Sequence, residues 1–408
     1  MLLTRALRTF AYGYLGVVLG AYLDQLGLDP FLIGIVLTSA VVGSAVMTVV
    51  WSLLADRVGR RRTVAIMAGL MTAGGLLFAL TDQFALLLVG AFTGTISVTS
   101  SEFGVFQTVE QAILPQTAPS ERRTWIFSIY NFTANIAQAV GSLFAASVGV
   151  FAGLGLSGPD AYRPLFVLYA LIGLANLAIF ASLSERVELA RVEGERRLFG
   201  IHRSRGMVAR LSALFAFDSF AGGFVVYSVV AYWFYLRWGF EPGALAVLFF
   251  AVNVLSGLSL LVAGWLAGRI GLLNTMVFTH LPSNVLLMLV PFMPTPGLAV
   301  AVYLARMSLS QMDVPTRQSY VMAVVAPDER TATAGITNLA RISGTAASPA
   351  LAGLAFSLAA LGLPFVVSGA LKIPYDLLLY RTFRHIRPPE EEARRIAAAA
   401  AVAVPTTD

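Results

Sequence analysis

Charged residues within apolar stretches are the positions where this sequence is best equipped for chemistry. In the stretch 297–325, polar side chains recur at helical spacing, at Arg306, Ser310, Asp313 and Arg317. A charged group is costly in hydrocarbon, so such side chains face a cavity or a partner. Pro315 lies within the same run and is expected to kink or open the helix. This polar face, the richest in the chain, is typical of a path for a solute or an ion.

Spacing along a helix separates the charges that can pair locally from those that cannot. Asp313 and Arg317 stand four residues apart, as do Lys372 and Asp376, so each pair can form an ion pair within its own helix. Four other charges have no partner at that distance, and we predict substrate contact or proton handling for them. Ion pairs between helices are the alternative. These four residues are Glu102, Asp218, Arg306 and Arg341.

The remaining candidates are ranked behind these four. Asp313 and Arg317 stay in the set as possible contacts for substrate or protons, and Lys372 and Asp376 follow them. Glu110 lies near the end of its apolar stretch and is expected to belong to a gate network.

Asp218 carries the most specific hypothesis. It lies about ten residues into the apolar stretch 208–236 and is followed by Gly222 and Gly223. A carboxylate at that depth is expected to bind and release a proton, because its neutral form crosses an apolar barrier more easily. Asp218→Asn is therefore predicted to abolish proton-coupled transport while the protein still folds.

Composition places the chain in a membrane. Hydrophobic residues make up 57% of the 408 residues and charged residues only 12%, about half the charged share of a soluble domain. In such a chain the net charge of +6 reports orientation and gives no reason to expect nucleic acid. The sequence has no cysteine, His-Glu-x-x-His motif or phosphate-binding loop. We therefore expect no enzyme, no metal site and no cofactor.

Apolar stretches long enough to cross a bilayer recur along the whole sequence. They predict an all-α membrane protein of about twelve transmembrane helices in two six-helix bundles, 1–183 and 208–387. A polar loop, 184–207, separates the bundles, and a tail, 388–408, follows them. The expected spans are 6–23, 31–54, 63–80, 84–112, 124–151, 164–183, 208–236, 242–267, 273–290, 297–325, 331–358 and 363–383.

Two internal matches indicate that the halves are repeats. The segment 52–62 resembles 264–274, and 119–122 resembles 327–330, at nearly the same offset. Most arginines fall on the side of these segments, so the positive-inside rule predicts a cell-membrane protein with both termini and the central loop in the cytoplasm.

The segment 52–62 carries a family resemblance. It is similar to the loop signature of the major facilitator superfamily, Gly-x-x-x-Asp-Arg/Lys-x-Gly-Arg/Lys-Arg/Lys, although Ser52 replaces the leading glycine. The matching residues are Asp56, Arg57, Gly59, Arg60 and Arg61. The second copy keeps Gly264, Arg269 and Gly271, with Gly268 at the position of the acid.

The resemblance implies a transporter whose halves rock around a central cavity, with these loops as a cytoplasmic gate. Asp56 is expected to face the start of the helix near Thr331, and Gly59 to permit a tight turn. Enforcing orientation is the alternative role for the arginines. Two markers of drug–proton antiporters are missing. The stretch 84–112 has no arginine, and the stretch 124–151 offers only Ala-Val-Gly141-Ser, without proline, where those antiporters have a Gly-Pro-x-x-Gly-Gly-like run.

We therefore expect a monomeric secondary transporter in the lipid bilayer that exports or exchanges a small organic solute, coupled to protons. Arg306 and Arg341 motivate the alternative of an importer or uniporter for a small organic anion. A membrane sensor that transports nothing is the alternative of another class.

Overall fold

A computed structural model describes residues 1–98, 104–106, 110, 123–182, 203–325 and 329–386. Its regular elements are all helical, with no strand among the described residues. Eight of the described helical segments are long and apolar enough to cross a membrane. These findings confirm the predicted all-α membrane fold of two six-helix bundles.

The first bundle is built from seven described α-helices and a short 3-10 turn. They are α1 (Leu2–Gln25), α2 (Pro30–Val58), α3 (Arg60–Leu80), α4 (Phe84–Phe92), α6 (Arg123–Phe144), α7 (Ser147–Gly153), η3 (Gly158–Ala161) and α8 (Arg163–Ala181).

The second bundle contains nine described α-helices. They are α9 (Arg205–Gly223), α10 (Tyr227–Trp238), α11 (Pro242–Ile270), α12 (Leu272–Leu289), α13 (Pro296–Ser310), α14 (Asp313–Val324), α15 (Arg330–Thr345), α16 (Ser348–Ser357) and α17 (Leu363–Phe383).

Four expected spans are each divided into two helices, as α6 and α7, α9 and α10, α13 and α14, and α15 and α16. Pro315 explains the break between α13 and α14. It lacks an N–H, and its ring would clash with the carbonyl four residues earlier, that of Gln311, where α13 has just ended. The expected polar face from Arg306 to Arg317 is therefore not one face of one helix.

The fourth span differs from the expected 84–112, because α4 ends at Phe92. Gly94 follows with a φ of +69°, a backbone conformation that favours glycine. A Cβ at Gly94 would lie 2.7 Å from the carbonyl carbon of Gly43 on α2. This close approach carries the chain from α4 into an irregular segment, 93–98, inside the bundle.

The same helix pairs recur in both bundles. In the first, α1 packs along α6, α3 along α8 and α2 along α4; in the second, α9 packs along α15, α12 along α17 and α11 along α13. Each of the three pairs in the second bundle is the counterpart, six spans later in the chain, of a pair in the first bundle, as the two sequence matches predicted.

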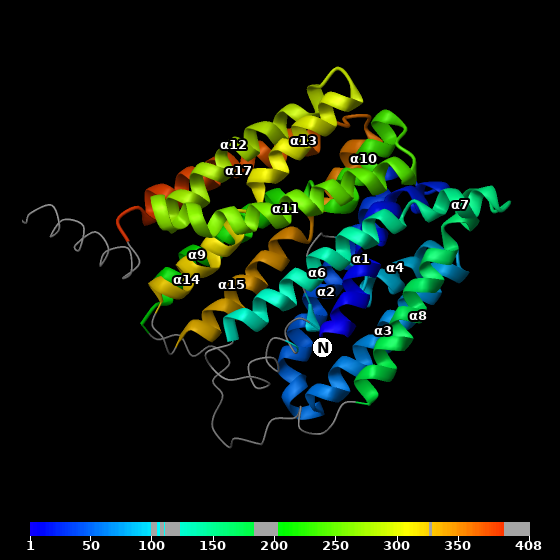
Figure 1. Ribbon diagram of the computed structural model, residues 1–408, viewed down its shortest axis with the longest axis horizontal. Coiled ribbons are helices and arrows are strands. Elements are labelled where there is room, and N and C mark those ends of the chain that lie inside the picture. Colours follow the sequence, from blue (N-terminus) through cyan, green and yellow to red (C-terminus); the bar gives the residue numbers. More distant parts are fainter. Residues whose placement is uncertain (99–103, 107–109, 111–122, 183–202, 326–328, 387–408) are drawn as a thin grey trace, which may run out of the picture.

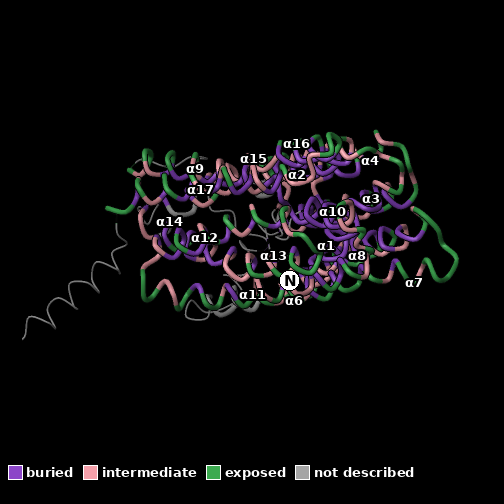
Figure 2. The backbone as a smooth tube through the Cα atoms, turned by 90° about the horizontal axis from the view of Figure 1, so that it is seen from above, coloured by how far each residue is buried: buried purple, intermediate pink, exposed green. Residues whose placement is uncertain are grey.

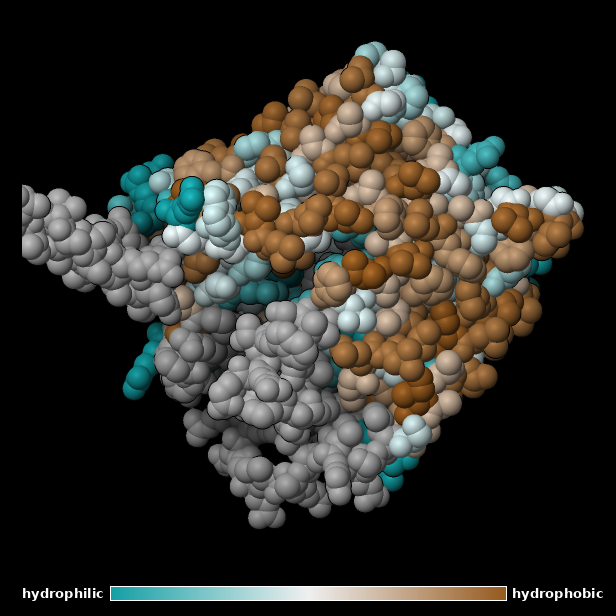
Figure 3. All heavy atoms as spheres, viewed as in Figure 1, coloured by the Kyte–Doolittle hydropathy of each residue, from teal (hydrophilic) through white to brown (hydrophobic). Residues whose placement is uncertain are grey.

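The bundles meet through α2 against α16, α6 against α11 and α1 against α10. In Figure 1 they share one end, beside α10, and separate toward the opposite end, where the first residue of the chain lies. Figure 2 shows the backbone coloured by burial, with buried residues gathered toward the interior and exposed residues along the outside. Large apolar side chains such as Leu261 and Leu358 are 76% and 72% exposed, and much of the outer surface is hydrophobic (Figure 3), as lipid contact requires.

Candidate functional site

A cavity that is partly open to solvent lies where the two bundles meet, and the empty space in and at the mouth of it is about 740 Å³. Its walls come from α1, α2, α3 and the segment 94–98 on one side, and from α9 and α15 on the other. Figure 3 shows polar residues in a recess between the bundles, in contrast to the hydrophobic exterior.

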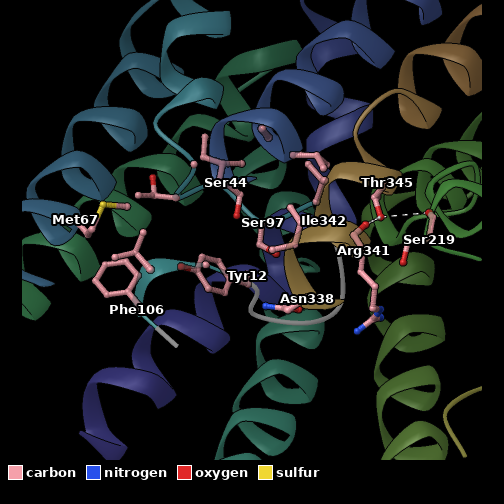
Figure 4. Close-up of a pocket in the computed structure, with 18 residues that line it drawn as sticks. Tyr12, Ser44, Met67, Ser97, Phe106, Ser219, Asn338, Arg341, Ile342 and Thr345 are labelled. Carbon is pink, nitrogen blue, oxygen red and sulfur yellow. Dashed lines mark hydrogen bonds between the residues drawn. The ribbon is translucent and has the colours of Figure 1, made fainter. Parts of the chain in front are cut away.

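One face of α15 forms the wall from the second bundle. Arg341 and Ile342 lie three and four residues after Asn338, and Thr345 lies four and three residues after them, so all four share one face of the helix and line the cavity. Arg341 is the one charged side chain among the lining residues that the structure describes. The Thr345 hydroxyl donates to the carbonyl of Ser219 at 3.2 Å, which joins α15 to α9 (Figure 4).

The opposite wall is largely apolar. Tyr12 on α1, Met67 on α3 and Phe106 lie across the cavity from the α15 face in Figure 4. Ser44 and Ser97 add hydroxyl groups between these apolar side chains. The cavity therefore presents a charged and polar side and an apolar side to a ligand.

A buried charge cluster in the second bundle adjoins the cavity at Ser219. The neighbouring Asp218 accepts a hydrogen bond from the Lys372 ammonium at 2.6 Å and lies 3.8 Å from a guanidinium nitrogen of Arg317. Arg317 also contacts Asp313 at 2.7 Å. The local pair Asp313–Arg317 forms as its spacing suggested, and Asp218 takes part in an ion pair between helices.

The second local pair, Lys372 with Asp376, does not form. Lys372 instead donates to Asp218 on α9. Asp376 contacts two residues of α12: the Nδ1 of His280 lies 2.8 Å away, and the Asn284 amide donates to Asp376 at 2.9 Å. Both side chains are buried, and each meets a partner on a different neighbouring helix. Contacts between helices thus replace the pair within α17.

Arg306 lies on α13 outside the set of cavity-lining residues. Its guanidinium is 5.8 Å from the ring of Tyr303 and donates to the sulfur of Met307 at 2.9 Å. Of the two arginines that motivated an anion site, only Arg341 lines the cavity.

The first bundle contains a second buried pair, which the sequence analysis missed. Arg8 and Glu110 are both 0% exposed, and their side chains meet at 2.7 Å. The Tyr130 hydroxyl also donates to Glu110, at 2.7 Å. Arg8 falls inside the expected first span, 6–23, but it lies so near the start of that span that its charge suggests a flanking position. In the structure α1 starts at Leu2 and carries Arg8 into the bundle. The signal that could have found the pair is that Arg8 is a charge within an expected span, as Glu110 is.

Comparison with known proteins identifies the family. A model of the Major Facilitator Superfamily matches residues 1–349. The chain belongs to this superfamily. It is also 25% identical over 412 residues to the uncharacterized membrane protein YJR124C of Saccharomyces cerevisiae, with 91% of each chain covered.

Solved structures of the superfamily share the fold. The nucleoside transporter NupG (D323A mutant) has a TM-score of 0.73 at 12% identity, covering 93% of this chain and 98% of that one. A bacterial homolog of the human lysosomal transporter Spinster gives 0.72 at 16%, covering 95% and 96%. The xylose transporter XylE from E. coli gives 0.70 at 16%, covering 96% and 98%. This superfamily member is therefore a secondary transporter by fold and family, and not an enzyme.

The signature loops of this superfamily member show matching backbones. Gly59 and Gly271, which are equivalent in the two copies, have φ angles of +101° and +90° at the starts of α3 and α12. Arg61 donates to the carbonyl of Ala181 at the end of α8, and Arg269 lies 4.2 Å from the ring of Trp265. Gly264 lies within α11.

Several predicted positions fall outside the described residues. Glu102 is one of them, and the side chains of Asp56, Arg57 and Arg60 are the others. The expected contact of Asp56 with the helix start near Thr331 falls there too, since the Thr331 side chain is also not described.

The shared end of the two bundles is closed by contacts that sequence reasoning did not anticipate. Asp24 on α1 accepts from the Tyr232 and Tyr235 hydroxyls of α10 at 2.8 and 3.2 Å. Beside it, α2 and α16 touch through glycines: a Cβ at Gly353 would lie 2.3 Å from the carbonyl oxygen of Pro30 and 2.9 Å from the Cα of Gly34. Glycines at a helix crossing let two backbones approach this closely.

Proposed function

We propose that this secondary transporter exports a small organic solute across the cell membrane in exchange for protons. The observation that carries the proposal is the cavity between the bundles, which is bordered by a buried cluster of ionisable side chains. Alternating access needs a site that both bundles line, and this cavity has walls from both. The proposal takes the bundles as 1–183 and 208–387, joined by a cytoplasmic loop and followed by a cytoplasmic tail.

The orientation supports an inward-facing state. The starts of α3 and α9 and the ends of α11 and α17 lie where the bundles separate (Figure 1), and these helix ends carry Arg61, Arg205, Arg269 and Arg381. The positive-inside rule assigns that end to the cytoplasm, together with both termini. The opposite end, closed by Asp24 and the glycine contact, then faces outward. The Spinster homolog and XylE of similar fold were captured in inward-facing or inward-open conformations.

Proton coupling is proposed for the cluster around Asp218. Its carboxylate faces Lys372 on α17, Arg317 on α14 and, farther away, His280 on α12. Lys372 and Arg317 favour the ionised form of Asp218 in this state. We propose that protonation of Asp218 in another state of the cycle removes its attraction for Lys372 and frees α17 from α9. Because the next residue, Ser219, lines the cavity, such a change in contacts would reach the solute site directly.

The gate is proposed to use the signature loops. Gly59 and Gly271 provide the turns, and Arg61 anchors the first loop to the end of α8. We propose that Asp56, Arg57 and Arg60 close the cytoplasmic end when the bundles rock toward each other. Gly268 cannot supply an acid in the second loop, so Asp56 is expected to matter more than any residue there.

Flux measurements test this function. Purified protein in liposomes loaded with a mixture of small organic solutes should release at least one of them faster when the outside is acidic, and a dye inside should report proton entry. Asp218→Asn should remove the dependence on the pH gradient. Release that ignores the gradient would favour the alternative, an importer or uniporter for a small organic anion, which Arg341 in the cavity wall motivates. No flux of any solute would favour a sensor.

A further inference from the structure

His280 is a buried titratable side chain in the middle of α12. Only 5% of its side chain is exposed, and its Nδ1 lies 2.8 Å from Oδ1 of Asp376 on α17. The other oxygen of Asp376 accepts from the Asn284 amide at 2.9 Å. The contacts described for His280 are made by Nδ1, which leaves Nε2 without a hydrogen-bond partner among the described residues. An ionised Asp376 needs a hydrogen on Nδ1, so Nε2 is the nitrogen that can gain or lose a proton.

The His280–Asp376 pair adjoins the cluster around Asp218. Asp376 follows Lys372 on α17 by four residues, about one helical turn, and Lys372 donates to Asp218 at 2.6 Å. These contacts run from α12 through α17 to α9, where the neighbouring Ser219 lines the cavity. The other charged and titratable side chains that act on the cluster lie on four helices. They are Tyr375 on α17, Asp313 and Arg317 on α14, Arg306 on α13 and Arg341 on α15.

Lys372 has two carboxylates within its range. Its partner in this structure is Asp218, and Asp376 stands at the four-residue spacing that allows an ion pair within one helix. A buried ion without a counter-charge is costly. When Asp218 takes up a proton, Lys372 therefore needs another anion, and Asp376 is the carboxylate on its own helix that can supply it.

The same cost applies to Asp376. While His280 is protonated, its positive charge balances that of Asp376. When Nε2 loses its proton, Asp376 needs another cation, and Lys372 is the one that can reach it along α17. Loss of a proton by His280 and gain of a proton by Asp218 therefore leave both remaining ions paired when the two events occur together. The total charge of the four side chains is then the same before and after.

The geometry points to His280 as a second proton-binding residue, which gives up a proton as Asp218 takes one up, while Lys372 moves from Asp218 to Asp376. The N–H bond at Nε2 breaks and an O–H bond forms at the Asp218 carboxylate, and each electron pair stays with its nitrogen or oxygen. This inference rests on the proposed function, because it takes Asp218 as the proton site of the cycle. It adds the residue that works with Asp218 and the lysine whose exchange separates α17 from α9.

Titration of the histidines is the first test. The chain contains three histidines, His202, His280 and His385, so protein labelled with 15N-histidine gives three sets of ring signals in an NMR spectrum. His202→Asn and His385→Asn identify two of the sets and leave the third to His280. The His280 signals should titrate between about pH 5 and pH 8. His280 signals that stay unchanged over that range would overturn the inference, whether or not any solute is transported.

Proton entry into liposomes loaded with the same solute mixture is the second test. His280→Asn keeps an amide that can donate to Asp376 in place of Nδ1, but it does not titrate. It should slow proton entry severalfold and remove the part of the pH profile that follows the His280 titration. Asp376→Asn should also slow proton entry severalfold, because Lys372 then lacks its second carboxylate.

His385→Asn is the matched control, because it makes the same substitution at an exposed residue. It should leave the rate and the pH profile as in the unchanged protein. Full proton entry in folded His280→Asn or Asp376→Asn, together with its loss in Asp218→Asn, would overturn the inference and leave the proposed function intact. If His280→Asn does not fold, Asp376→Asn and the histidine titration still decide. An absence of proton entry in the unchanged protein would refute the proposed function, and this inference with it.

Discussion

The Lys372 ammonium lies 2.6 Å from Oδ1 of Asp218 and joins α17 to α9 across 154 positions of sequence. The pair is almost completely buried, with 8% and 7% of the two side chains exposed. Removing one partner of a buried pair leaves an uncompensated charge, which costs about 3–5 kcal/mol. The contact therefore holds two helices of the second bundle together, whatever part it plays in transport.

The first prediction concerns this pair. Asp218→Asn and Lys372→Met should each lower the free energy of unfolding by about 3 kcal/mol or more, since each leaves a buried charge behind. The double variant should lose less than the sum of the two. Thermal unfolding in detergent, followed by tryptophan fluorescence, measures the three changes. This revises the expectation from sequence that Asp218→Asn leaves folding intact.

Asp160→Asn serves as the control for that series. Asp160 pairs with Arg163 at 2.9 Å, but its side chain is 56% exposed, and an exposed pair contributes at most about 1 kcal/mol. Equal losses from Asp160→Asn and Asp218→Asn would contradict the argument from burial.

The second prediction concerns the buried pair in the first bundle. Glu110 accepts from Arg8, Tyr130 and Thr4 at 2.7, 2.7 and 3.2 Å. Glu110→Gln should destabilise the protein by about 3–5 kcal/mol, because Arg8 is then buried without its counter-charge. Tyr130→Phe removes the neutral donor to Glu110 and also the hydroxyl that accepts from Arg5 at 2.7 Å, so it should cost about 1–3 kcal/mol, less than the loss of the charge. Melting temperatures of the two variants and of the double variant Arg8→Gln/Glu110→Gln measure these losses. A larger loss from Tyr130→Phe than from Glu110→Gln would show that the Arg8–Glu110 pair is unimportant.

The third prediction addresses the closed end. Gly353→Ala should force α16 away from α2, since its Cβ would meet the Pro30 carbonyl oxygen at 2.3 Å. The chain contains no cysteine, so a single cysteine placed at Ala40 in the cavity wall can report access from outside. A membrane-impermeant maleimide should label it severalfold faster in the Gly353→Ala background.

Gly297→Ala is the control for the third prediction, because nothing lies within 4 Å of a Cβ at that position. It should leave labelling at the rate of the parent. If Gly353→Ala labels no faster than Gly297→Ala in folded protein, the glycine contact does not keep this end closed.

The fourth prediction concerns the signature loop. Gly59 has a φ of +101°, where an alanine is strained by about 1–3 kcal/mol. Gly59→Ala should therefore lower both stability and flux. Gly268→Ala, in the second copy, has an ordinary φ and open space around its Cβ, so it should be close to neutral. Initial rates in liposomes compare the two variants, and a neutral Gly59→Ala would refute the need for a tight turn.

The sequence by itself determined the class, the repeat and the approximate position of most spans. Apolar length sets where a helix can cross a bilayer, and clusters such as Arg60–Arg62 mark the ends that stay in water. The glycines at 59 and 271 were found as equivalent positions in two copies of one motif, and their backbones agree. The break near Pro315 was also readable, because proline acts on its own helix.

Only the tertiary structure decided which charges meet. Helical spacing describes neighbours three or four residues away, so it suggested Lys372 with Asp376 and found no partner for Asp218. The observed contacts of Lys372 with Asp218 and of Arg8 with Glu110 depend on how each helix is rotated against the next. That rotation is set by packing between helices distant in sequence, such as α9 and α17. The same packing turns Arg341 toward the cavity and leaves Arg306 outside it.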